Sequence, residues 1–243
     1  MSPQRSFLLV TVLLALAGVS ARAQGKPGGD FPLAQGTYWV YRGFVRWTVA
    51  NSSTVKLTRV TWKTEVTRTI YRDGMTIAVV RGMPGDLDWS DGNPTPSLSI
   101  VIRTRDAKFY LVEDDEAKTL IGELDHPQFS WGQVPVDHDW FLQLPLAKGK
   151  KFCEAEGMQR TDNHYCWVTG APHAAELANV KGIPQGKRAA YRVEYFTNPD
   201  DDEFDFVPGI GMVTYGYHHH GTVADTELHL IEFHDGADKI PGK

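Results

Sequence analysis

Cysteine is scarce in this sequence of 243 residues, which contains only Cys153 and Cys166. The two lie too far apart for the C-x-x-C spacing of redox sites and many zinc sites. An isolated pair in an oxidising compartment is most simply bonded, so we predict a Cys153–Cys166 disulfide. The alternative, a metal or redox pair, lacks the spacing that would support it.

Catalytic signatures are also missing. The sequence contains no G-x-S-x-G, H-E-x-x-H or Walker loop, the motifs of serine hydrolases, zinc proteases and nucleotide-binding proteins. Basic clusters are absent, and 30 acidic residues outnumber 25 basic ones, which gives a net charge of −5. Such a surface is poorly suited to a phosphate backbone. These absences favour a protein that is not an enzyme, without deciding the question, and we expect no nucleic-acid partner.

The sequence contains only one long apolar run, which lies at the amino end. Phe7–Val19 follows Arg5 and precedes residues 21–23 (Ala-Arg-Ala), an A-x-A cleavage site. This arrangement predicts a signal peptide at residues 1–23 and a periplasmic or secreted mature protein. The run is shorter than the roughly 20 apolar residues that a membrane helix needs, so we expect no membrane span in the mature chain. An uncleaved amino-terminal anchor is the alternative.

Helical periodicity is scarce, and strand patterns dominate the rest of the chain. The best helix candidate is Pro172–Val180, with proline in its first turn. Val55–Tyr71 is a long strand candidate whose apolar residues change parity, which predicts a bulge near residues 58–60. Asp73-Gly74 is typical of a hairpin turn. The other predicted strands are Thr37–Thr48, Met75–Arg81, Leu98–Thr104, Lys108–Val112, Lys118–Glu123, His164–Thr169, Arg188–Thr197, Met212–His220 and Thr226–Phe233.

These patterns predict a mainly β fold with a single antiparallel sheet. We place one β domain at residues 36–235. A flexible lead-in rich in glycine and proline precedes it at residues 24–35, and a disordered tail follows at residues 236–243.

Two acidic segments are candidates for ion binding, and neither is assigned a site. Asp86–Gly92 fails the EF-hand pattern because its glycine comes one position late. Asn198–Glu203 is interpreted as a solvated turn, with adventitious calcium binding as the alternative.

Three short motifs carry a resemblance to a known group of proteins. They are Leu144–Lys151 (LPLAKGKK), Ala190–Tyr195 (AYRVEY) and Phe206–Tyr215 (FVPGIGMVTY). Over roughly residues 36–234 the chain resembles exported bacterial β proteins of unknown function that are similar to the lipoprotein carriers of the Lol system. The resemblance implies a strongly curved antiparallel sheet, a half-barrel, with one short helix or loops on its concave side. It also implies a lipid or lipoprotein-like ligand.

Aromatic residues are abundant, with seven tryptophans and nine tyrosines. Trp39, Tyr41, Trp47 and Trp62 lie on two adjacent predicted strands, where the concave face of a half-barrel would present them to a lipid or another apolar small molecule. The alternative is that these side chains fill the core.

Histidines and acids gather in the segment 217–229. We predict a hairpin that turns near Thr222-Val223, with Tyr217 opposite Leu228. That register brings imidazoles and carboxylates onto one face, where they suit zinc, copper or iron. The predicted ligands are His218 opposite Glu227, His220 opposite Asp225, and His229. The alternatives are an exposed hairpin with histidine–carboxylate contacts and no ion, or a patch that responds to pH.

Together these features favour a non-catalytic periplasmic or secreted protein that binds an apolar ligand or an envelope partner, with no cofactor expected. One alternative is a metal-binding protein or metal-dependent enzyme that uses the hairpin of His218 and Glu227. The other is a purely structural envelope protein.

Overall fold

The computed structural model describes residues 31–138, 140–153 and 155–239. The predicted signal peptide therefore lies outside the described residues, as do most of the lead-in and residues 240–243 of the predicted tail. The short helix η3 (Gly236–Lys239) lies within the segment predicted as a tail. Phe31 and Leu33, which the sequence analysis placed in the lead-in, are buried in the core.

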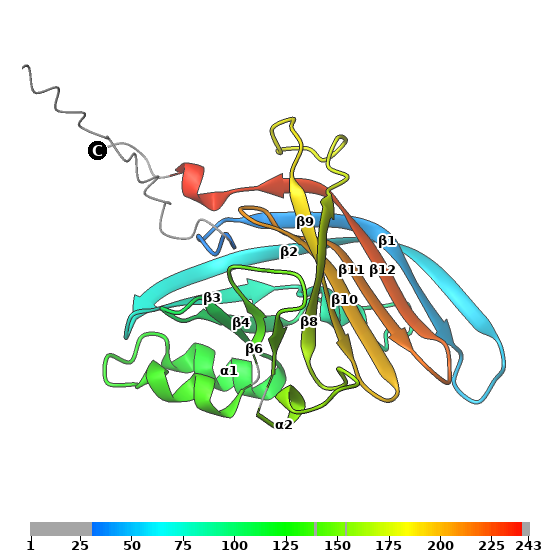
Figure 1. The fold of residues 1–243 in the computed structure, drawn as a ribbon, viewed down its shortest axis with the longest axis horizontal. Coiled ribbons are helices and arrows are strands. Elements are labelled where there is room, and N and C mark those ends of the chain that lie inside the picture. The colour runs from blue at the N-terminus through cyan, green and yellow to red at the C-terminus, as the bar shows by residue number, and fades with distance from the viewer. Residues whose placement is uncertain (1–30, 139, 154, 240–243) are drawn as a thin grey trace, which may run out of the picture.

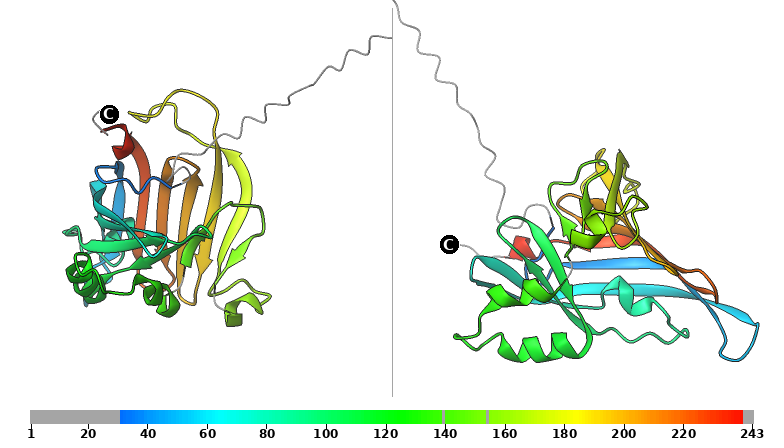
Figure 2. Two further views of the ribbon diagram at one scale, coloured as in Figure 1. Left: turned by 90° about the vertical axis from the view of Figure 1, so that its left-hand side faces the viewer. Right: turned by 60° about the horizontal axis from the view of Figure 1, so that its bottom comes forward.

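The chain forms one sheet of twelve strands, all of whose paired neighbours are antiparallel, and the sheet curves until it is nearly closed into a barrel (Figures 1 and 2). This confirms the predicted mainly β fold. The strands are β1 (Tyr38–Thr48), β2 (Val55–Arg72), β3 (Met75–Arg81), β4 (Leu98–Arg103), β5 (Lys108–Val112), β6 (Trp140–Gln143), β7 (Lys151–Phe152), β8 (Trp167–Ala174), β9 (Ala189–Phe196), β10 (Asp200–Val207), β11 (Gly211–His219) and β12 (Ala224–His234).

The order of the strands shows where the barrel stays open. Consecutive strands are neighbours from β1 to β6 and again from β7 to β12, and β12 returns to pair with β1. The short strands β6 and β7 are thus the two edges of the sheet. They approach each other without pairing, and the barrel has an open seam between them.

Side chains and loops fill the concave side. The ring of Phe31 lies 5.8 Å from that of Trp39, 5.5 Å from Phe109 and 5.6 Å from Phe206, which places it among strands from both halves of the sheet. The short helix η1 (Pro84–Leu87) adds Leu87 to the same core. Loops and a short helix therefore cover the concave side, as the resemblance implied.

A second layer covers the convex side of β3, β4 and β5. The helix α1 (Asp114–Glu123) packs there through Ala117 and Leu120, in a cluster that includes Ile77 and Ile100. The short helix η2 (Trp131–Asp137) extends this cluster with the fully buried Trp131. Among the described residues, no helix is long and apolar enough to cross a membrane.

Three predictions about secondary structure were wrong. Lys118–Glu123 belongs to helix α1 rather than a strand, because the acidic residues at the start of α1 suit a helix N-terminus and Ala117 and Leu120 share one helical face. Pro172–Val180 is not a helix, since residues 172–174 pair with β9 and the remainder forms a loop. Residues 200–203 of the predicted acidic turn form the first half of β10.

The bulge in β2 lies elsewhere than predicted. The pairing of β1 with β2 runs from Tyr38 to Thr48 without a shift, so residues 58–60 contain no bulge. The register of β2 against β3 shifts between Val66 and Arg68 instead. Val55 and Leu57 misled the prediction because they are apolar residues on the exposed face of β2, near the free end of the hairpin, with 47% and 55% of their surface exposed.

The predicted Cys153–Cys166 disulfide is confirmed, with the two Cα atoms 4.8 Å apart. It joins the end of β7 to the residue just before β8 and lies beside the short helix α2 (Ala155–Met158).

Candidate functional site

The interior of the barrel has almost no free space near the aromatic residues that the sequence proposed for ligand binding. Trp39, Tyr41 and Trp62 are all at least 95% buried. Each donates its polar hydrogen to a backbone carbonyl: Trp39 to Ile210 (2.6 Å), Tyr41 to Met212 (3.0 Å) and Trp62 to Gly82 (2.9 Å). The cavity beside Trp39 and Tyr41 measures about 10 Å³, which is no more than one water molecule occupies.

Trp47 lies apart from the other three aromatic residues. It is half-buried near the end of β1, where it lines a surface hollow of about 380 Å³ together with Trp89. The structure therefore does not bring the four predicted ligand-binding residues together on one open face.

A cavity of about 280 Å³ opens on the seam side of the barrel. We call it the carboxylate pocket, because Asp88, Glu113 and Asp202 line it together with Tyr215. The lining comes from η1 and the residues next to it, from β5 and β6 on one arm of the sheet, and from β8 to β11 on the other (Figure 1). The pocket thus lies where the two arms face each other.

Tyr215 connects two of the acids. It is buried in β11, and its hydroxyl lies 2.5 Å from Oδ2 of Asp88 and 3.2 Å from Oδ1 of Asp202. A phenol has one proton and donates it to one acceptor. The contact with the other carboxyl is therefore favourable only when that carboxyl carries a proton of its own.

Asp88 has an unsatisfied oxygen in the pocket. Its Oδ1 atom is buried and accepts no hydrogen bond of good geometry from the described residues, although the Thr226 hydroxyl lies close enough to lower the pKa of the Asp88 carboxyl. Such atoms are rare in native proteins and call for an explanation, because a buried acceptor without a donor costs about 1–3 kcal/mol.

Gly85 marks the point on which three of these groups converge. A Cβ atom on this glycine would lie 3.6 Å from Asp88 Oδ2, 3.8 Å from the Tyr215 hydroxyl and 3.9 Å from Glu113 Oε1. Glu113 is exposed as a residue, yet its carboxyl turns toward this point from the start of α1. The absence of a side chain at position 85 leaves this part of the pocket open.

Burial and mutual repulsion change the ionisation of the three acids. Burial raises the pKa of Asp202 to about 6, and the charges of Asp200 and Asp201 add to the rise. Burial also raises the pKa of Glu113 to about 7, supported by the charge of Asp86. For Asp88 burial raises the pKa well above its ordinary value, although the hydrogen bond from Tyr215 opposes the rise. The pocket therefore holds acids that take up protons near neutral pH.

Aromatic side chains form the walls of the pocket. Trp167 on β8 lies 5.0 Å from Tyr195 and 5.4 Å from Phe204, measured between ring centroids. Phe141 on β6 continues the wall, 6.4 Å from Phe204. An apolar wall with a few convergent polar groups is the usual composition of a small-molecule site.

The predicted histidine hairpin has a different register. Tyr215, rather than Tyr217, lies opposite Leu228, because a loop at residues 220–223 replaces the predicted two-residue turn. The pairing of β11 with β12 is thus shifted by two positions from the prediction. Each side chain stays on its predicted face of the sheet, but the residue opposite it on the other strand is a different one.

The five predicted metal ligands consequently separate into individual histidine–carboxylate contacts. His218 lies 3.3 Å from Asp225, His229 lies 3.0 Å from Glu227, and His220 lies 2.6 Å from Asp201. Asp225 also accepts a hydrogen bond from Arg46 at 2.7 Å. In the part of the chain that the structure describes, no three His, Cys, Asp or Glu side chains are arranged to hold a metal ion. The metal site stays a prediction without a preformed set of ligands.

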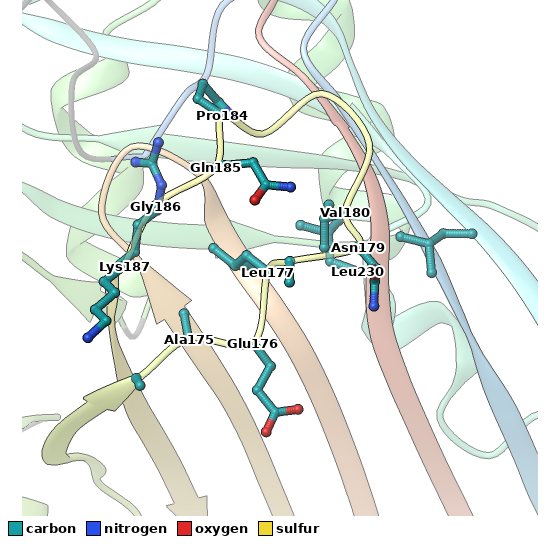
Figure 3. A pocket seen from close by; sticks show the side chains of 14 residues that line it. Ala175, Glu176, Leu177, Asn179, Val180, Pro184, Gln185, Gly186, Lys187 and Leu230 are labelled. Carbon is teal, nitrogen blue, oxygen red and sulfur yellow. The ribbon is translucent and has the colours of Figure 1, made fainter.

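A larger hollow of about 630 Å³ lies beneath the loop between β8 and β9 (Figure 3). Its floor is apolar, from Leu177, Val180 and Leu230, while the loop residues around it are mostly exposed. Gln185 points into the hollow, and Lys187 points away from it. It lacks the converging buried polar groups that distinguish the carboxylate pocket.

Comparison with known proteins assigns the chain to no family. No family model matches the chain, and no curated protein matches it. A solved protein from Bacteroides fragilis, named as exported and with a YmcC-like fold, is 12% identical; the match covers 84% of this chain and 98% of that one, with a TM-score of 0.41. A lipoprotein from Parabacteroides distasonis is 13% identical over 84% of this chain and 97% of its own, with a TM-score of 0.39.

Likeness at this level carries no argument about function. Neither name mentions the Lol carriers, so the resemblance to them stays a prediction.

Proposed function

We propose that this protein is an exported, non-catalytic binding protein that holds a small, partly apolar ligand in the carboxylate pocket. The observation that carries the proposal is the pocket itself, about 280 Å³ in volume, with aromatic walls and a buried, unsatisfied oxygen on Asp88. A ligand with a hydrogen-bond donor would bind the carboxyl oxygens that converge near Gly85, and its apolar part would contact the ring of Phe204 and its neighbours.

The size of the pocket narrows the predicted ligand. The sequence suggested a lipid on the concave face, but the space there is about 10 Å³. Small-molecule sites are commonly about 300–1,000 Å³, and the carboxylate pocket, at about 280 Å³, lies just below that range. A compact ring or short chain therefore fits better than a complete lipid. The sequence analysis also proposed an envelope protein as the partner. Such a partner would bind an exposed surface of the protein rather than this pocket.

Gly85→Ala tests the proposal with little disturbance of the fold. The new methyl group would have no contact closer than 3.6 Å, and the backbone at Gly85 is not in the left-handed region. The methyl group would occupy the point on which the oxygens of Asp88, Tyr215 and Glu113 converge. Gly122→Ala is the matched control, because a Cβ there meets nothing within 4 Å and the residue lies on the exposed side of α1.

The measurement is a ligand-observed NMR screen with aromatic and alicyclic fragments that carry one polar group. We expect to find fragments that bind the wild type and Gly122→Ala with similar affinity. The same fragments should bind Gly85→Ala at least tenfold more weakly. Fragments that bind all three proteins equally, or a screen without any bound fragment, would contradict the proposal.

A further inference from the structure

We infer that the ligand of the carboxylate pocket carries a positively charged nitrogen, as an alkylammonium or arylalkylammonium ion does. The inference rests on the proposed function and adds the chemical class of the ligand. It starts from the geometry of Asp88, Tyr215 and Asp202.

When its carboxyls are ionised, the empty pocket has too few protons for its acceptors. Two carboxyls share the single hydroxyl proton of Tyr215, and Oδ1 of Asp88 receives no hydrogen bond. An ammonium group brings up to three N–H donors and no acceptor. It therefore completes this set of acceptors, whereas another acceptor would add to the deficit.

Charge leads to the same conclusion. The negative charges of nearby acids raise the pKa of each carboxyl of the pocket: Glu113 and Asp202 act on Asp88, Asp86 and Asp114 on Glu113, and Asp200 and Asp201 on Asp202. Among the described residues that line the pocket there is no Lys, Arg or His. Among the largest influences on the pKa of Asp202 is one basic side chain, His218, which is paired with Asp225. Ionised carboxylates in this cavity would thus be compensated by the ligand.

The walls distinguish an organic cation from a metal ion. The rings of Trp167, Tyr195 and Phe204 line the pocket, and aromatic rings attract ammonium groups that lie within about 6 Å of the ring centroid. A divalent metal would need several oxygen or nitrogen ligands at close range, and the three acids of the pocket are not among groups that could hold one. Carboxylates beside aromatic faces are the combination that suits an amine with an apolar body.

Matched pairs of amines and alcohols test the charge of the ligand. The probes are 2-phenylethylamine with 2-phenylethanol, tryptamine with tryptophol, and cyclohexylmethylamine with cyclohexylmethanol. Affinities are measured by titration calorimetry at pH 5 and pH 8, where the amines stay protonated. We expect the best amine to bind at least tenfold more tightly than its alcohol at pH 8. We also expect its affinity to fall at least tenfold at pH 5, because protonated Glu113 and Asp202 no longer attract the cation.

Proton release gives an independent measurement. Near pH 6.5 the amine should displace protons from the pocket, so the observed binding enthalpy should differ between phosphate and Tris buffers in proportion to their ionisation enthalpies. Asp202→Asn should weaken amine binding at pH 8 at least tenfold and leave the alcohol nearly unaffected. The exposed Asp91, changed to Asn, is the control.

The outcomes separate this inference from the proposed function. Alcohols that bind as tightly as their amines, or amine binding that is the same at pH 5 and pH 8, would refute the cationic ligand. In that case the proposed function would still stand if Gly85→Ala abolished the binding of these amines and alcohols. Failure of all six probes and of the fragment screen would refute both.

Discussion

Replacing Asp202 with asparagine should stabilise the protein at neutral pH. The folded protein raises the pKa of this carboxyl from 3.8 to about 6, chiefly through burial, so its ionisation opposes folding. The protonated acid favours the folded state below pH 4, and that stabilisation is lost as the pH rises through about 6. The difference corresponds to about 3 kcal/mol in the free energy of unfolding, as an upper value. Asparagine at position 202 keeps an oxygen that can accept a hydrogen bond from the Tyr215 hydroxyl, and burying its neutral amide has no cost of charge burial.

The assay is urea denaturation followed by tryptophan fluorescence at pH 4, 6 and 8, for the wild type, Asp202→Asn and Asp91→Asn. We expect Asp202→Asn to match the wild type at pH 4 within about 0.5 kcal/mol and to exceed it by about 1–3 kcal/mol at pH 8. Asp91→Asn, at an exposed position outside the pocket, should follow the wild type at every pH. The reasoning would be refuted by an Asp202→Asn variant whose stability changes with pH in parallel with the wild type.

Three further predictions concern the rest of the molecule. Replacing Cys153 and Cys166 with alanine should lower the free energy of unfolding by about 3 kcal/mol in the chain-entropy model for a loop of roughly this length; a loss below about 1 kcal/mol in urea denaturation would contradict it. Arg192→Met should cost about 3 kcal/mol, because Arg192 contacts both carboxylate oxygens of the buried Asp205 at 2.6 and 3.0 Å. Adding Asp205→Asn should restore much of that stability, and an additive double variant would show that the pair is not the cause. Elemental analysis after dialysis should find less than one zinc ion per protein. One zinc ion per wild-type protein, lost in His218→Ala, would instead support the metal site predicted from the sequence.

The sequence predicted a strand correctly where the apolar pattern of the strand and the residues of its adjoining turn lie close together in the chain. Asp73 and Gly74 both adopt positive φ, at 54° and 77°, as a tight hairpin turn requires, and this turn joins β2 to β3 as predicted. Residues 172–174 show the opposite case. Their surroundings suggested a helix, but pairing with β9 decided their conformation, and a distant partner strand is not visible in a local pattern.

The candidate site could not be predicted from spacing, because it is assembled across the whole sheet. Asp88 and Tyr215 are 127 positions apart and meet only when the barrel closes. One clue was present: Asp202 and Phe204 have the same parity on β10, and both line the pocket. Interpreting residues 198–203 as a solvated turn concealed that clue, since parity has meaning only within a strand.

The pocket also bears on the alternative of a purely structural protein. The barrel fills its interior with its own aromatic side chains almost completely, and the cavity at the open seam is where acids replace apolar residues. These acids oppose folding at neutral pH, Asp202 by up to about 3 kcal/mol, while Asp88 leaves a buried oxygen unsatisfied. A scaffold would gain stability from uncharged residues at these positions, and binding sites are where proteins commonly retain such unfavourable groups. A gain in stability for Asp202→Asn, together with a loss of amine binding in the same variant, would therefore count against a structural role and for a binding role at one site.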